Sequence, residues 1–284
     1  MPTSDPAAPR TERRRTLQRR QRRRRIVAIV ALLLLGVAVM AGAIVYAGRD
    51  QPPPPEPLRT ITLTVPEGYS REQTAELARE AGLRGDYMKA SEGHEGYLFP
   101  DTFELVKKAP ASDLVQLQLE DFKRRFAGVD MGYARSKNLT ERDVVTIASM
   151  VEEEAQLDSE RKLIAAVIYN RLREGIPLGI DATVRFATGN YDQPLTESEL
   201  AVDSPYNTRL NAGLPPGPIS SPGLASLQAA AHPARVDYLY YVVKPGACGE
   251  HSFSAGAAEF EADVAAYDEA REAAGGESPD SCGE

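Results

Sequence analysis

Residues 140–156 read TERDVVTIASMVEEEAQ, and the spacing of the apolar residues in this stretch decides the fold around it. Thr140 and Asp143 are residue types that favour a helix start, so we expect a helix from Glu141 to about Gln156. At roughly 100° per residue, the apolar side chains fill one broad arc of this helix. The arc consists of Val144, Val145, Ile147, Ala148, Met150, Val151 and Ala155. Such a helix needs protein on much of its surface, which predicts a core element.

Three consecutive glutamates close this helix, and they point in different directions. Glu153 falls on the polar side, whereas Glu152 and Glu154 lie on opposite flanks of the apolar arc. Burial disfavours the charged form of a carboxyl group and raises its pKa, which suits a general acid. The same pattern is also consistent with a partly covered helix whose glutamates are solvated, or with a structural Glu–Arg ion pair.

The flanking sequence predicts an α+β fold. Before the helix, the patterns predict a strand at Arg59–Val65, a turn at Pro66–Gly68, a helix from Ser70 to about Ala81, and a helix capped by Ser112 and running to about Phe126. After it, they predict a helix capped by Asp158 or Ser159 and stopped by Gly175, a strand at Tyr238–Val243 and a helix at Ala257–Ala273. Residues 176–225 are rich in Pro, Gly and Asn, which predicts short strands and ordered loops.

An apolar segment divides the charge of the chain. Residues 1–50 hold eleven arginines against three acids, a net charge of +8, and the whole chain is at −8, so residues 51–284 carry −16. The uncharged run Ile26–Ala47 is long enough to cross a bilayer as a helix. Ten arginines precede it, so the positive-inside rule predicts a cytoplasmic N-terminus, a single-pass anchor in the cytoplasmic membrane and an extracytoplasmic domain. The arginines also predict contact with anionic membrane lipid.

A cleaved signal peptide is the alternative to an anchor, because Ala41-Gly42-Ala43 has the form of a cleavage site. The apolar run is longer than a signal peptide needs and continues past that site, which favours the anchor. Asp50–Pro57 then predicts an extended spacer. An exported domain permits a disulfide, and the sequence leaves open whether Cys248 and Cys282 form one.

Several function classes lack their signatures. The sequence has no phosphate-binding loop, dinucleotide fingerprint, zinc spacing or nucleophile elbow, and the charge of −16 argues against a nucleic-acid partner. His232 and His251 have no second ligand at local spacing, so we expect structural histidines, no metal and no cofactor. Without those signatures, the chemistry has to come from carboxylates, histidines and amides.

Four blocks of sequence carry a resemblance to a known family. They are EGYLFPDTF at Glu95–Phe103, IASMVEEEAQLDSERKLIAAVIYN at Ile147–Asn170, YNTRLNAGLPPGPISSPG at Tyr206–Gly223 and AAAHPARVDYLYYV at Ala229–Val242. In this order they resemble the endolytic murein transglycosylases of the MltG (YceG-like) type, over about residues 60–270. The resemblance implies a lytic transglycosylase that cuts peptidoglycan glycan strands between MurNAc and GlcNAc, leaves 1,6-anhydro-MurNAc ends, and acts in cell-wall assembly and the termination of nascent strands.

The resemblance also implies roles for single residues. The family's catalytic glutamate is the first of a Glu-x-Glu pair, here Glu152, which protonates the glycosidic oxygen and then deprotonates the sugar's own 6-hydroxyl. Because that hydroxyl replaces water, no second catalytic carboxylate is needed. Glu154 supports catalysis and is the competing choice. Matching positions that predict substrate contacts are Asn170, Asp181, Thr183, Tyr206, Asn207 and Ser220, with structural hydrogen bonds as the alternative for each.

The resulting domain prediction has six parts: a cytoplasmic Arg-rich tail (1–25), a transmembrane helix (26–47), a Pro-rich linker (48–58), a small LysM-like strand-helix module (59–93), a mixed α+β catalytic domain (94–270) and an acidic tail (271–284). The module is shorter than the family's, which puts independent glycan binding in doubt. Phe260 also stands where the family usually has a histidine after a glutamate. Predicted partners are glycan strands, membrane lipid, and peptidoglycan synthases of the elongation or division machinery.

Two rival functions remain open at the level of sequence. A muramidase would use water and a second carboxylate, with Asp181 as the best choice. A membrane-anchored scaffold that binds peptidoglycan without cutting it would need no acid at all.

Overall fold

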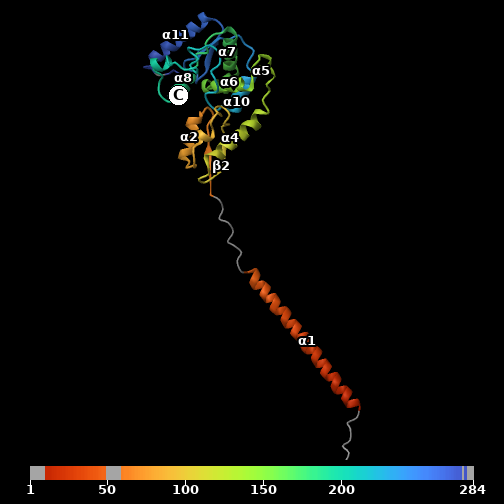
Figure 1. Cartoon of the computed structure of the whole chain (residues 1–284). Helices are drawn as coiled ribbons and strands as arrows, with labels where there is room; N and C mark the ends of the chain where they lie inside the picture. Colours follow the sequence, from red (N-terminus) through yellow and green to blue (C-terminus); the bar gives the residue numbers. More distant parts are fainter. Residues whose placement is uncertain (1–9, 49–58, 277, 280–284) are drawn as a thin grey trace, which may run out of the picture. The chain divides into compact units, whose positions relative to one another are not determined.

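A computed structural model describes residues 10–48, 59–276 and 278–279. The chain divides into two units, residues 1–57 and 58–284 (Figure 1). The first unit contains α1 (Arg10–Ala47). Among the described residues, the Arg19–Ala47 part of α1 is the one helix long and apolar enough to cross a membrane, judged by length and composition. The predicted spacer Asp50–Pro57 and Cys282 lie outside the described residues.

The second unit begins with a two-stranded antiparallel sheet. Strand β1 (Thr60–Thr64) pairs with β2 (Thr102–Val106), with Thr60 opposite Val106 and Thr64 opposite Thr102. The residues between the strands contain α2 (Arg71–Glu80) and α3 (Tyr87–Ala90), and α4 (Ala111–Phe126) follows the sheet. The predicted capping box is present at α2, where Ser70 accepts from the backbone of Gln73 and the Gln73 side chain accepts from the backbone of Ser70.

A small hydrophobic core joins these elements. Leu63 on β1, Phe103 and Leu105 on β2, Ala78 on α2 and Leu114 on α4 are buried together. The sheet and this core contain residues from both sides of position 94, the predicted start of the catalytic domain. The mixed α+β fold is confirmed, while the LysM-like character of residues 59–93 stays a prediction.

Helix α6 (Glu141–Glu154) is the central element of the larger core. Thr140 and Asp143 form a reciprocal capping box at its start, as their residue types predict. Every residue from Val144 to Val151 is buried, including Thr146 and Ser149 on the predicted polar side. Their hydroxyls donate to the carbonyls of Arg142 and Thr146 within the helix, which satisfies them without water.

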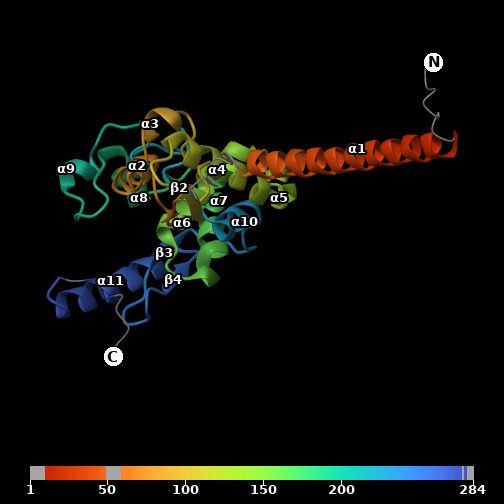
Figure 2. The same ribbon diagram turned by 90° about the horizontal axis from the view of Figure 1, so that it is seen from below.

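The remaining elements surround α6 or extend the domain. They are α5 (Gly132–Ser136), the short 3-10 helix η1 (Asp158–Glu160), α7 (Arg161–Glu174), α8 (Asp181–Thr188), α9 (Glu197–Leu200), α10 (Leu224–Ala231), β3 (Tyr240–Val243), β4 (His251–Ser254) and α11 (Ala257–Ala273). Helices α7 and α10 pack against α6, while α11 packs on the antiparallel β3–β4 pair (Figure 2).

Three local predictions were wrong. Neither Asp158 nor Ser159 caps α7, which begins at Arg161 with Glu160 at the cap position and no side-chain cap. Residues 176–225 hold the helices α8 and α9 within loops and contain no strand, because their Pro and Gly residues mark helix ends and turns rather than strand ends. Ser112 does not cap α4, since that helix begins one residue earlier with Pro110 at the cap position and no side-chain cap. The helix ends, by contrast, follow the sequence: Gly175 closes α7 in the left-handed conformation.

Gly96 provides a test of how closely the segment 93–99 packs on the loop 214–223. A Cβ atom on Gly96 would overlap the ring of Pro218 and lie 3.1 Å from Cγ1 of Val145, and its φ is +81°. Gly93 has a similar φ of +78° but open space around it. We expect Gly93→Ala to lower the free energy of unfolding by about 1 kcal/mol, from backbone strain alone. Gly96→Ala should cost roughly 3 kcal/mol or more, because strain and overpacking add. Equal losses in urea denaturation would contradict this packing.

Candidate functional site

The C-terminal turn of α6 places three adjacent carboxyl groups in three different surroundings. Successive residues differ by roughly 100° around the helix axis, so each glutamate reaches a different neighbouring element. Glu152 meets α7 and α10, Glu153 meets the turn after β1, and Glu154 meets β3 and α8. The three carboxyl groups therefore differ in their hydrogen-bond partners and in the charges near them.

Glu152 is held as an ion pair. Its Oε1 accepts from Nη1 of Arg161 at 3.0 Å, and its Oε2 accepts from the backbone N–H of Gly223 at 2.9 Å. The side chains of Glu152 and Arg161 are only 6% and 12% exposed. Arg161 also donates to the hydroxyl of Ser226, which links α7 to α10. Both carboxylate oxygens are therefore used in contacts that join three segments of the core.

Glu67 lies beside this pair and brings a further carboxyl group. Its carboxyl packs so closely on Gly223 that a Cβ atom there would overlap it. Burial, and then the charge of Glu152, raise the pKa of Glu67. The backbone of the same turn pairs with the neighbouring loop, since the N–H of Gly68 donates to Ser221 O and that of Ser221 to Tyr69 O.

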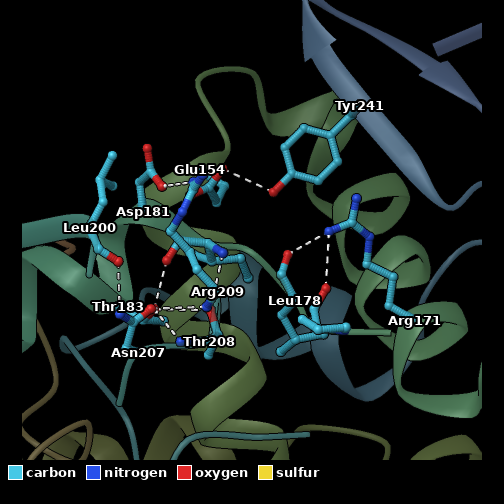
Figure 3. Close-up of polar contacts among 12 residues, drawn as sticks. Glu154, Arg171, Leu178, Asp181, Thr183, Leu200, Asn207, Thr208, Arg209 and Tyr241 are labelled. Carbon is cyan, nitrogen blue, oxygen red and sulfur yellow. Dashed lines mark hydrogen bonds and ion pairs between the residues drawn. The ribbon is translucent and has the colours of Figure 1, made fainter. Parts of the chain in front are cut away.

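Glu154 has a different environment (Figure 3). Its Oε2 accepts from the hydroxyl of Tyr241 on β3 at 2.9 Å, and the residue has the same intermediate exposure as Glu152. Burial raises the pKa of Glu154, and the nearby charge of Asp181 raises it further, while the Tyr241 hydrogen bond acts in the opposite direction. A raised pKa favours the protonated form that a general acid needs.

Asp181 stands at the first turn of α8, and its charge acts on Glu154. Nη1 of Arg209 donates to its Oδ1 at 2.6 Å, and both side chains are about half exposed, at 52% and 42%. Behind them, the buried hydroxyls of Thr183 and Thr208 lie 3.0 Å apart, and Thr208 also accepts from the N–H of Ile180. The threonines thus fix the start of α8 and with it the position of Asp181.

Glu153 is exposed, as its helical position predicts, and it lines a cavity of about 70 Å³ with Gly68, Arg185 and Tyr191. Desolvation raises the pKa of Glu153 to about 7. Phe186 lines this cavity and also a larger one of about 250 Å³, where Tyr206 and Glu95 contribute to the wall. We call these two cavities, which share Phe186 in their walls, the groove.

Comparison with known proteins places this architecture in a family. The sequence profile described as the YceG-like family matches residues 46–266, more than three quarters of the chain. The chain belongs to the YceG-like family. A crystal structure of a putative YceG-like protein from Listeria monocytogenes superimposes with a TM-score of 0.65 at 28% identity, covering 72% of this chain and 76% of that one.

Two curated relatives of this YceG-like chain are named endolytic murein transglycosylases. The protein from Bacillus subtilis is 39% identical over 152 residues, which cover 53% of this chain. The protein from Streptococcus pneumoniae strain R6 is 30% identical and covers 69% of this chain. Each match spans 42% of the relative's own length, so the likeness concerns about two fifths of those proteins.

Only some of the predicted site residues of this YceG-like chain come together. Glu154 and Asp181 lie close to each other, with Thr183 beneath Asp181. Ser220 is buried against α6, where its hydroxyl donates to Ser149 O at 3.3 Å, and it hydrogen-bonds the Glu153 side chain. Tyr206 is half-buried on the wall of the larger cavity, with its ring 4.9 Å from that of Phe186.

Asn207 and Asn170 do not face the groove. The Asn207 side chain is fully buried: its Nδ2 donates to Leu200 O and Val202 O, and its Oδ1 accepts from the N–H of Arg209 (Figure 3). These bonds favour a loop-shaping role for Asn207, while its sugar contact stays a prediction. Asn170 donates to Val236 O and Tyr238 O, which ties α7 to the segment before β3.

Sequence reasoning missed Tyr241 and Arg209 as partners of the acids. A signal for Tyr241 exists: in the strand predicted at residues 238–243, it shares a face with Leu239 and Val243, and a buried tyrosine hydroxyl requires a partner. Arg209 has no such signal. His251 is a structural histidine as expected, since its backbone N–H and Nδ1 both lie within hydrogen-bond distance of the buried Glu160 carboxylate.

The groove should make stability depend on pH. Burial raises the pKa of Glu95 to about 7, above its ordinary value of 4.5, so the folded protein binds more protons than the unfolded chain between these values. Its contribution therefore falls as pH rises from about 4.5 to about 7. We expect Glu95→Gln to reduce the loss of unfolding free energy between pH 5 and pH 8, measured by urea denaturation. Parallel pH profiles for both proteins would contradict a raised pKa at Glu95.

Proposed function

We propose that this protein is an endolytic lytic transglycosylase that cuts peptidoglycan between MurNAc and GlcNAc and leaves 1,6-anhydro-MurNAc ends. Membership of the YceG-like family and the names of two relatives support the activity. The observation that carries the assignment to residues is Glu154, an acid with a raised pKa, a hydroxyl partner and the charge of Asp181 nearby.

Glu154 suits both proton transfers of this reaction. Protonated, it donates to the glycosidic oxygen as the bond to C1 of MurNAc breaks; as a carboxylate, it then takes the proton from the 6-hydroxyl of the same sugar, whose oxygen closes on C1. No water is consumed, and the acid is regenerated. The Tyr241 hydroxyl stabilises the carboxylate formed between the steps, because it donates to Oε2.

Glu152, the choice made from the family motif, remains the alternative acid. Its contacts support a different role, since the ion pair with Arg161 and the hydrogen bond from the Gly223 N–H give each carboxylate oxygen a partner on a neighbouring segment. The geometry at the end of α6 therefore favours Glu154 for chemistry and Glu152 for holding α7 and the Gly223 loop in place.

Matched glutamine variants distinguish the two glutamates. We expect Glu154→Gln to reduce cleavage of isolated glycan strands by about 10²–10⁴-fold, the usual contribution of a general acid, with little change in thermal stability. Glu152→Gln should instead destabilise the protein by roughly 3 kcal/mol, because it leaves the buried Arg161 without its main partner. Full activity in Glu154→Gln, with loss confined to a folded Glu152→Gln protein, would return the role to Glu152.

Mass spectrometry of the products separates transglycosylation from hydrolysis. Because Asp181 lies close to Glu154, a muramidase with Asp181 directing water is the second candidate function. Anhydro ends support our proposal, whereas reducing ends 18 Da heavier would establish hydrolysis. Intact strands after incubation with the folded wild-type protein would favour the non-catalytic scaffold. A role in terminating nascent strands beside peptidoglycan synthases follows from the anchored, endolytic activity.

The location of the reaction follows from α1. We propose that Arg19–Ala47 crosses the cytoplasmic membrane once, with the arginine-rich N-terminus in the cytoplasm near anionic lipid and the domain outside. Protease added to intact cells without their wall should digest the domain and spare an N-terminal tag. Loss of the tag with the domain protected would reverse the orientation.

A further inference from the structure

The groove beside the glutamates contains arginines without carboxylate partners. Arg71 and Arg142 line the cavity of about 250 Å³, and Arg185 lines the adjoining cavity of about 70 Å³. Within residues 59–276, none of the three forms an ion pair with an acidic side chain. Cations left unpaired are unexpected in a region of the sequence whose net charge is −16, where acids are abundant.

Both arginines of the larger cavity are held in place by backbone carbonyls. Arg142, at the start of α6, donates from Nη2 to Pro216 O at 2.8 Å. Its guanidinium lies so close to Gly217 that a Cβ atom there would be 2.8 Å from Nη2. Arg71, at the start of α2, donates to Met88 O at 2.6 Å and to the hydroxyl of Ser91 at 3.0 Å. Each keeps further N–H groups for a ligand.

Glu95 is the acidic residue in the wall of the larger cavity, and its carboxyl group already has a partner within the protein. Both oxygens of Glu95 accept from the backbone N–H of Arg71, at 3.0 and 3.3 Å, so its carboxyl is directed at the start of α2. The Tyr206 ring, packed on Phe186, closes the other side of the cavity. The cavity thus combines two oriented guanidinium groups with an aromatic wall, an arrangement that matches a carboxylate on a peptide-like substituent.

We propose that Arg71 and Arg142 bind a carboxylate of the stem peptide attached to the glycan strand, while the strand itself lies against the glutamates at the end of α6. This rests on the proposed function, which supplies the polymer. Phe186 lines both cavities, and Glu153 lines the smaller one at the end of α6. A stem peptide branching from a sugar bound at the end of α6 would reach the arginines past Phe186.

Binding measurements test this independently of cleavage. Soluble strands with free stem carboxylates are compared with the same strands after carbodiimide-coupled amidation, which removes the charge and keeps the length. The protein is the full chain in detergent with Glu154→Gln, at low salt. We expect about tenfold tighter binding of the free-carboxylate strands, since charge-assisted hydrogen bonds to arginine are lost on amidation. Equal affinity for the two strands would overturn the proposal.

Arginine variants test whether Arg71 and Arg142 cause the tighter binding of strands with free carboxylates. Adding Arg71→Ala and Arg142→Ala should reduce the tenfold preference to less than about twofold. Arg124→Ala, an exposed position on α4 paired with Asp121, is the matched control and should keep it. If the double alanine variant unfolds, Arg71→Lys with Arg142→Lys keeps the charges, loses the forked geometry, and should show an intermediate preference of about threefold. A tenfold preference that survives in the double variant would refute the role of these arginines.

The failure of the proposed function looks different. If the wild-type protein cleaves neither strand, the proposed transglycosylase activity is refuted. The ratio of the affinities for the free-carboxylate and amidated strands still tests the carboxylate site. If it cleaves both, we expect the preference to appear in KM rather than in kcat, because the arginines contact a part of the substrate remote from the broken bond.

Discussion

The burial of α6 on all sides is the constraint on which the rest of the domain depends. Eight consecutive residues of one helix lose contact with water, so every neighbouring segment must supply either an apolar surface or a hydrogen-bond partner. Helices α7 and α10 supply the apolar surface. The loop around Ile219 supplies polar contacts, since its N–H donates to the buried hydroxyl of Ser149 at 3.1 Å. The core and the positions of the groove loops are consequently set by the same helix.

This constraint also explains why the glutamates differ. At the end of a fully enclosed helix no carboxyl side chain can turn wholly to bulk water, so each must find a compensating contact or hold a proton. Glu152 pairs with Arg161, Glu154 accepts a hydrogen bond from the Tyr241 hydroxyl, and Glu153 lines a small cavity. An ion pair at Glu152 and a tyrosine hydrogen bond at Glu154 are thus two solutions to one desolvation problem, two residues apart.

Much of the fold follows from local sequence signals, whereas the site follows from distant contacts. Short-range sequence patterns predict four features that are all present in the structure. They are the capping boxes at Ser70 and Thr140, the helix stop at Gly175 and the helix Ala257–Ala273. Helical periodicity also identified the two flanking glutamates. It could not choose between them, because Arg161 and Tyr241 reach them from other segments. For the same reason the sequence could not show the three backbone partners of the buried Asn207 amide.

The burial of α6 has a consequence for how this sequence can vary in length. Inserting or deleting one residue between Thr140 and Val151 would rotate the last turn by roughly 100° relative to the capped end. The three glutamates would then exchange surroundings, so that the ion pair, the cavity and the tyrosine contact would each receive the wrong side chain. Loops elsewhere in the chain can absorb such changes at their exposed tips. Helix α6 cannot absorb a change in length. The number of residues between its capped start and the glutamates is therefore as important to the site as the glutamates themselves.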